Sequence, residues 1–146
     1  MVQVERIERA RQVMRTPDND WPEPMRVFQY ERHLFLISAY KLIEHVDWAL
    51  RLNFLDKSLF AEIHSLRGEI KSLRDMNEHA VEYFLGKGRR RDEWLHVDEG
   101  AIADASSTID TKIGNRLDWN EVATITRRLL NALPKFYYPI HETNAE

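Results

Sequence analysis

Apolar residues recur along most of the chain at the three- and four-residue spacing of amphipathic helices. Residues 4–15 are the first such stretch, with an apolar face made of Val4, Ile7, Ala10, Val13 and Met14. A turn-rich stretch, 16–20, separates it from a second run that begins near Pro24 and stays apolar to Leu52. Because its apolar stripe is wide, this second helix is expected to be covered on more than one side.

A third long helix is predicted between Asp56, as its N-cap, and the glycines at 86 and 88. Its expected core face is Leu59, Ile63, Leu66, Ile70, Leu73, Asn77, Ala80 and Phe84. Roughly 30 residues rising 1.5 Å each give a rod of about 45 Å. Its length matches that of the second helix, so the two are predicted to form a long antiparallel hairpin.

The helical period is lost between Trp94 and Leu117, where small, polar and β-branched residues and a Gly114-Asn115 turn signal predict a loop with one short hairpin. Residues 118–121 then resemble a capping box and open a last helix, which Pro134 ends. Its apolar face is Trp119, Val122, Ile125, Leu129 and Leu133. The aromatic segment 136–139 is expected to pack on the helices.

Composition makes 1–146 one domain and narrows its chemistry. The chain has no cysteine, which excludes disulfides, thiolate metal sites and thiol nucleophiles. No targeting segment is visible and the longest apolar run, 34–37, is too short to span a bilayer, so the expected location is the cytoplasm, without a membrane partner. The formal charge of -3 disfavours a general polyanion binder, yet residues 87–91 carry four basic side chains and residues 92–111 carry six acidic ones.

The stretch from Arg74 to His79 is the main candidate for chemistry. On a helical wheel His79 lies opposite the core face, and Met76 and Tyr83 beside it give a partly apolar strip. That strip is predicted to be a dimer interface. Asp75, four residues before His79, can fix the imidazole tautomer, while the Arg74 guanidinium suits phosphate.

Basic residues follow this helix closely. Lys87, Arg89, Arg90 and Arg91 form a segment that could touch a phosphodiester backbone. Ordinary structural roles stay open: Arg74 and Glu78 fit a surface ion pair, and a basic run after a helix fits a solvated C-terminal cap. No metal site is predicted, since the other histidines lack ligand spacing, although a bundle metal site using His45 and His79 remains an alternative.

The segment Arg74-Asp75-Met76-Asn77-Glu78-His79 resembles the R-x(4-6)-H signature of the HEPN superfamily. The resemblance implies a mainly α fold, an up-and-down four-helix bundle whose core spans 24–133; the short β-hairpin or loop insertion predicted before the last helix is not part of the minimal bundle of that superfamily. The resemblance also implies a homodimer and, in active members, cofactor-free and metal-independent cleavage of RNA by attack of the 2′-hydroxyl on the adjacent phosphate.

Carried over by position, the resemblance makes His79 the general acid or base, Arg74 the residue that neutralises phosphorane charge, and Asp75 the residue that orients the site. The setting it implies is defence, stress or a toxin-antitoxin pair, with an antitoxin as a partner protein. On an ideal helix, however, Arg74 and His79 point about 140° apart. The alternatives are a non-catalytic interaction or oligomerisation module and a metal-dependent bundle enzyme.

Overall fold

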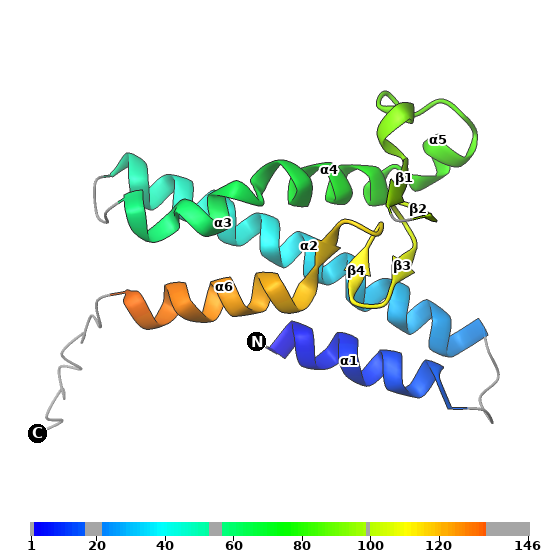
Figure 1. The fold of residues 1–146 in the computed structure, drawn as a ribbon, viewed down its shortest axis with the longest axis horizontal. Helices are drawn as coiled ribbons and strands as arrows, with labels where there is room; N and C mark the ends of the chain where they lie inside the picture. The colour runs from blue at the N-terminus through cyan, green and yellow to red at the C-terminus, as the bar shows by residue number, and fades with distance from the viewer. Residues whose placement is uncertain (1, 17–21, 53–56, 99, 134–146) are drawn as a thin grey trace, which may run out of the picture.

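The structure, a computed structural model, describes residues 2–16, 22–52, 57–98 and 100–133. Over these ranges the chain is mainly helical, with small antiparallel sheets before the last helix (Figure 1). The helices are α1 (Val2–Met14), α2 (Pro22–Arg51), α3 (Ala61–Ser65), α4 (Arg67–Glu78), α5 (Ala80–Phe84) and α6 (Trp119–Ala132), with 3-10 turns η1 (Lys57–Phe60) and η2 (Arg91–Glu93). None of these helices is both long and apolar enough to cross a membrane.

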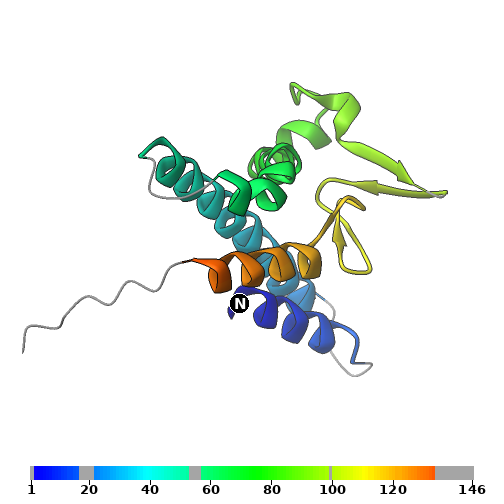
Figure 2. The same cartoon turned by 60° about the vertical axis from the view of Figure 1, so that its left-hand side comes forward.

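Helix α2 is the centre of the arrangement, as its wide apolar stripe predicts. Helix α1 packs along one part of it and α4 along another, while α6 contacts α1, α3 and η1 (Figures 1 and 2). The buried apolar residues of α2 are Phe28, Phe35, Leu36, Ala39, Ile43 and Val46. The predicted helices at 4–15 and 24–52 are therefore confirmed, with small shifts at their ends.

The single long third helix is wrong, because the segment is interrupted at Leu66 and again at His79. His79 has φ -109° and ψ 23°, outside helical geometry, and α5 starts after it. Two predicted core positions are consequently exposed, Leu59 by 38% and Phe84 by 66%. The apolar pattern continues across both interruptions, so the spacing alone reveals neither the breaks nor the exposure of these two residues.

The segment before α6 contains more β-structure than the one predicted hairpin. Strands β1 (Leu95–Asp98) and β2 (Ala101–Asp104) form a two-stranded sheet, and β3 (Thr108–Ile109), β4 (Lys112–Ile113) and β5 (Leu117–Asp118) form a three-stranded one. The turn signal is confirmed, since Gly114 and Asn115 adopt φ of 59° and 56° between β4 and β5. Strands of two to four residues are too short for alternation to reveal them.

This insertion, residues 94–118, packs against α4 and is also bonded to α2. The Asn77 amide donates to the carbonyl of Ala105 at 2.9 Å, and the Ser72 hydroxyl donates to Glu93 at 3.1 Å. Met76 is fully buried there. The predicted second contact surface is thus closed at Met76 by the chain itself, which corrects its assignment to a dimer interface.

Arg32 of α2 also binds this insertion. Its guanidinium donates to the Ser106 carbonyl and the Thr108 hydroxyl, and the residue is only 5% exposed. Burial lowers the pKa of Arg32 to about 10, against the raising effect of Asp104, so the side chain stays charged at neutral pH. A buried cation with these partners holds the insertion in one position over α2 and α4.

The start of α6 confirms the capping prediction. The Asp118 carboxylate accepts from the Asn120 amide at 2.8 Å and from the Thr111 hydroxyl at 2.9 Å. Trp119 is fully buried and donates from Nε1 to Glu8 at 2.7 Å, which ties α6 to α1. The proposed N-cap Asp56 and the aromatic segment 136–139 lie outside the described residues.

Gly114→Ala should test whether the insertion packs on α4. A Cβ at residue 114 would lie 2.9 Å from Leu73 Cδ2 and 3.2 Å from Ala105 Cα, at a φ of 59°. Backbone strain and overpacking together should lower the free energy of unfolding by about 2–4 kcal/mol, measured by urea denaturation.

Substitutions at two other glycines distinguish backbone strain from overpacking. Gly100→Ala, at φ 83° with open space, should cost only the backbone strain of about 1–2 kcal/mol. Gly68→Ala, helical and in open space, should stabilise by roughly 0.5–1 kcal/mol. Equal losses at Gly114 and Gly100 would show that Gly114 is not packed against α4.

Candidate functional site

A cavity of about 340 Å³ lies where α4 meets α5, beneath the loop that follows α5. It is lined by Asp75, His79, Glu82, Tyr83, Arg89 and Arg90. The structure therefore brings together one imidazole, two carboxylates and two guanidinium groups. Five of these six residues belong to the candidate set predicted from the sequence, and Glu82 is new.

The loop that carries the basic residues is held against the cavity by its backbone. At the end of α5 the Gly86 amide donates to Tyr83 O at 2.9 Å and the Lys87 amide donates to Glu82 O at 2.8 Å, a Schellman motif with Gly86 at φ 70°. The Arg91 guanidinium also donates to Gly86 O at 2.7 Å. These bonds hold both ends of the segment 86–91, which contains Arg89 and Arg90.

This loop packs on the ring of Tyr83. That ring stacks on Trp94, with centroids 5.0 Å apart and planes at 16°. Gly88 also lies so close to this ring that a Cβ there would come within 2.3 Å of Tyr83 Cδ1. Tyr83 was predicted at a dimer interface, but the face of its ring is already used inside the chain.

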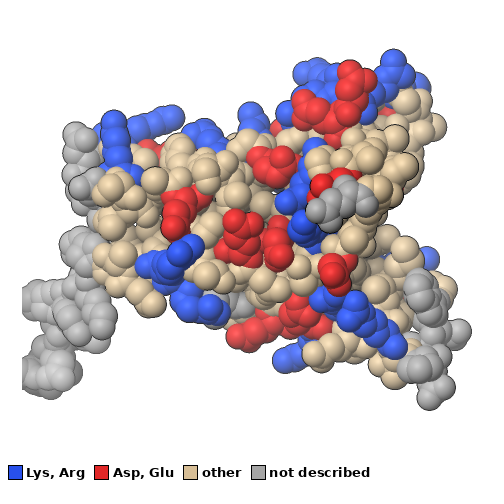
Figure 3. Space-filling model, viewed as in Figure 1, with Lys and Arg blue, Asp and Glu red and all other residues tan. Residues whose placement is uncertain are grey.

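The four basic residues of this loop are not equivalent. Arg90 pairs with Glu93 at 3.1 Å, and Arg91 is engaged with the Gly86 carbonyl. Lys87 and Arg89 are exposed, and no hydrogen bond or ion pair joins their side chains to the described part of the chain. Figure 3 shows basic side chains gathered over this loop at the upper right, with acidic ones beside them. Arg89 is thus the free cation that lines the cavity.

His79 is accessible, with 57% of its side chain exposed. Its Nδ1 lies 3.5 Å from Glu82 Oε1, an ion-pair distance if the imidazole is protonated. The predicted pairing of His79 with Asp75 is wrong, because the Asp75 carboxylate accepts from Arg74 instead. The backbone keeps the i to i+4 relation, since the His79 amide donates to the Asp75 carbonyl at 3.1 Å, but the two side chains have other partners.

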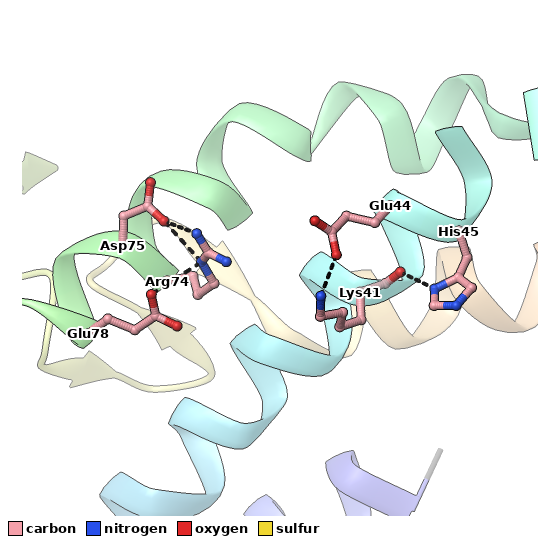
Figure 4. A network of polar contacts seen from close by, with 6 residues as sticks. All are labelled: Lys41, Glu44, His45, Arg74, Asp75 and Glu78. Atoms are coloured by element: carbon pink, nitrogen blue, oxygen red, sulfur yellow. Dashed lines mark hydrogen bonds and ion pairs between the residues drawn. The ribbon is translucent and has the colours of Figure 1, made fainter. Parts of the chain in front are cut away.

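Arg74 does not line the cavity: it lies beside Asp75 and Glu78 (Figure 4), with its guanidinium over the Tyr40 ring of α2. Its Nε donates to Asp75 at 2.9 Å and lies 3.8 Å from Glu78 Oε2, and its guanidinium carbon is 4.0 Å from the centre of the Tyr40 ring. Desolvation lowers the pKa of Arg74, but the hydrogen bond and charge of Asp75, with the charge of Glu78, outweigh it and raise that pKa. Arg74 and His79 thus diverge, and Asp75 is the residue that touches Arg74 and lines the cavity.

The metal alternative finds no ligand set among the described residues: no three His, Asp or Glu side chains there are placed to hold an ion. His45 Nδ1 lies 2.7 Å from the Lys41 carbonyl (Figure 4). A carboxylate-bound histidine does exist elsewhere, where Asp47 contacts His64 Nε2 at 2.8 Å. Those two residues come from different helices, so sequence spacing gave no signal for them, whereas Glu82 at i+3 from His79 could have been noticed.

Gly88→Ala should displace the basic loop. The added methyl group would overlap the Tyr83 ring, so the loop must move, and stability should fall by about 1–3 kcal/mol. Hydrogen exchange should show the Lys87 amide losing protection, because its bond to Glu82 O depends on the loop position. Unchanged protection of Lys87, with Gly68→Ala as the matched control, would contradict this contact.

Comparison with protein-family models, curated proteins and solved structures found no match to the chain. The resemblance of residues 74–79 to the HEPN signature therefore stays a prediction. A function for the cavity must be argued from the side chains that line it.

Proposed function

We propose that the chain is a HEPN-like four-helix bundle, built from α1, α2, α6 and the interrupted segment 61–84, that binds and cleaves RNA as a homodimer without a metal ion. The observation that carries the proposal is the cavity that gathers His79 with Arg89 and Arg90. An accessible imidazole beside two guanidinium groups can supply proton transfer and charge stabilisation for phosphodiester cleavage.

The proposed step is attack of a 2′-hydroxyl oxygen on the adjacent phosphorus. The new bond closes a 2′,3′-cyclic phosphate, the bond from phosphorus to the 5′-oxygen breaks, and that oxygen takes a proton while the 2′-oxygen loses one. His79, open to solvent, accepts or donates one of these protons. Arg89, which has no competing carboxylate partner, binds the phosphate, and Arg90 adds positive charge at the rim.

In this proposal Asp75 and Arg74 form the support behind the cavity. Asp75 lines it and holds the Arg74 guanidinium through two nitrogens. Arg74 reaches the phosphate only by leaving Asp75 and the Tyr40 ring. Asp75 is therefore a positioning residue, because the Arg74 guanidinium must leave its carboxylate before it can bind the phosphate. The proposed setting is cytoplasmic, in defence, stress or a toxin-antitoxin pair with a protein antitoxin.

RNA cleavage in the presence of EDTA is the direct test of this function. The protein should cut single-stranded RNA and leave cyclic phosphate ends, and His79→Ala should reduce the rate by about 10²–10⁴-fold, the contribution of a general acid or base. His45→Ala is the matched control, since His45 is a histidine on α2 outside the cavity. Cleavage that is unchanged in His79→Ala, or that EDTA abolishes, would contradict the proposal.

Measurements of RNA binding can distinguish a cavity arginine, Arg89, from a cation elsewhere on the protein. Arg89→Ala should weaken RNA binding and reduce the slope of log K against log salt by about one phosphate contact. Lys71→Ala is the control, because Lys71 is an exposed cation on α4 outside the cavity. Fluorescence anisotropy with a labelled oligonucleotide measures both, and equal losses in the two variants would place the contact elsewhere.

A second function, a non-catalytic interaction module, is supported by one specific feature. Three apolar side chains of α5 and its end are largely exposed, Val81 by 71%, Phe84 by 66% and Leu85 by 65%. Exposed apolar groups in one short segment suit a protein partner. Absence of any RNA binding in the assays above would favour this function.

A further inference from the structure

The hairpin of β1 and β2 has an apolar face that nothing in the described chain covers. Val97 is paired with Ile102 across the hairpin, and both are exposed, by 64% and 68%. Leu95 shares this face, two residues from Val97, and is 58% exposed. Ala103, on the opposite face, is 3% exposed. The hairpin therefore rests on the protein by one face and presents its large apolar side chains outward.

The outer edge of β1 is also open. The Ala105 amide donates to the Trp94 carbonyl at 2.9 Å, so residues 94 and 105 form a hydrogen-bonded pair. Antiparallel ladders alternate, which makes 96 and 98 the next hydrogen-bonded positions and turns the backbone groups of Leu95 and Val97 away from β2. The sheet contains only β1 and β2 among the described residues, so these groups have no strand beside them.

Such a hairpin is poorly stabilised by itself. Two strands are marginal in water, and an open edge with an apolar face is a template for a further strand. Natural edges are usually protected by proline, a bulge or lysine. Residues 95–98 contain no proline or lysine and no bulge interrupts their pairing with β2, so the short length of β1 and the charge of Asp98 are its only edge protection.

The charges on either side of β1 indicate which molecule pairs with its open edge. Residues 87–93, before β1, carry four basic and two acidic side chains, and residues 98–104, at its other end, carry three acidic and no basic ones. Two β1 strands placed antiparallel would set the basic end of each beside the acidic end of the other. Asp98 is available for this, because its own ion pair, with Lys112, spans 4.0 Å. A second copy of the chain therefore satisfies the edge, the apolar face and the charges together.

We propose that β1 pairs antiparallel with β1 of a second copy, which gives a four-stranded sheet across a two-fold axis with Leu95, Val97 and Ile102 of both copies on one face. This deepens the proposed dimer and moves its interface away from Met76 and Tyr83. The interface adjoins the cavity, because the loop that carries Arg89 and Arg90 leads directly into η2 and β1.

Single-cysteine cross-linking tests the pairing, since the chain has no cysteine of its own. Val97→Cys and Val81→Cys are matched, because both replace exposed valines, one on β1 and one on α5. With a short bis-maleimide at micromolar protein, Val97→Cys should give about tenfold more covalent dimer than Val81→Cys, because pairing raises the local concentration to millimolar. Equal yields, or more dimer from Val81→Cys, would overturn the proposal.

Light scattering on Val97→Pro provides an independent test. Proline removes the outward amide of Val97 without removing a bond to β2, and it should weaken dimerisation by roughly ten- to a hundredfold through the two lost hydrogen bonds. Val97→Thr, which keeps the amide and the β-branch, should weaken it less. A monomeric wild type at tens of micromolar would refute strand pairing.

The same samples separate this proposal from the nuclease. His79-dependent cleavage by a protein that does not cross-link through Val97→Cys overturns the sheet and leaves the cavity function standing. Cross-linking through Val97→Cys without RNA binding supports the sheet and removes the nuclease.

Discussion

The packing of α4 against both α2 and the insertion is the constraint on which the rest of the structure depends. The helix lies against α2, and the insertion 94–118 is bound to it by Asn77 and contacts Leu73 through the turn at Gly114. Ile70, Leu73 and Met76 are fully buried as a result. Arg32 holds the insertion to α2 at the same time. The buried apolar residues of α4 are therefore not available to another molecule, its exposed positions such as Lys71 and Glu78 are polar, and the candidate cavity lies at its C-terminal end.

That end is the interruption at His79, and it explains how the candidate cavity arises. Because α4 stops at Glu78 and α5 takes a new direction, His79 leaves the helical arrangement and becomes accessible. Tyr83 packs against Trp94 and Gly88 and brings the basic loop back toward the imidazole. Arg74, still inside the regular helix, stays with Asp75 and Tyr40. The two residues of the motif are thus separated, because Arg74 lies within the packed helix and His79 lies at its exposed end.

The elements that the sequence predicted well are those whose signals are local. The cap at Asp118 and the turn at Gly114 depend on neighbouring residues only, and α2 has a pattern long enough to be unambiguous. Periodicity could not show that Leu66 and His79 interrupt the third helix, because the apolar spacing continues across both positions although α5 has no buried residue. Nor could it show which segment covers Met76, since a wheel separates faces without naming their neighbours. Five residues of the candidate cavity were named from the sequence in separate roles, but their grouping in one cavity and the pairing of Asp75 with Arg74 required the geometry.

The central claim is that His79 and the basic loop form one binding site for RNA. The most direct measurement is amide and imidazole chemical-shift mapping during titration with a short 2′-O-methyl oligoribonucleotide, which binds as RNA does but lacks the attacking hydroxyl. The account predicts the largest changes at Asp75, His79, Arg89 and Arg90, which line one cavity. Changes centred on another surface, such as the one around the exposed Trp48, with the His79 imidazole unmoved, would contradict it.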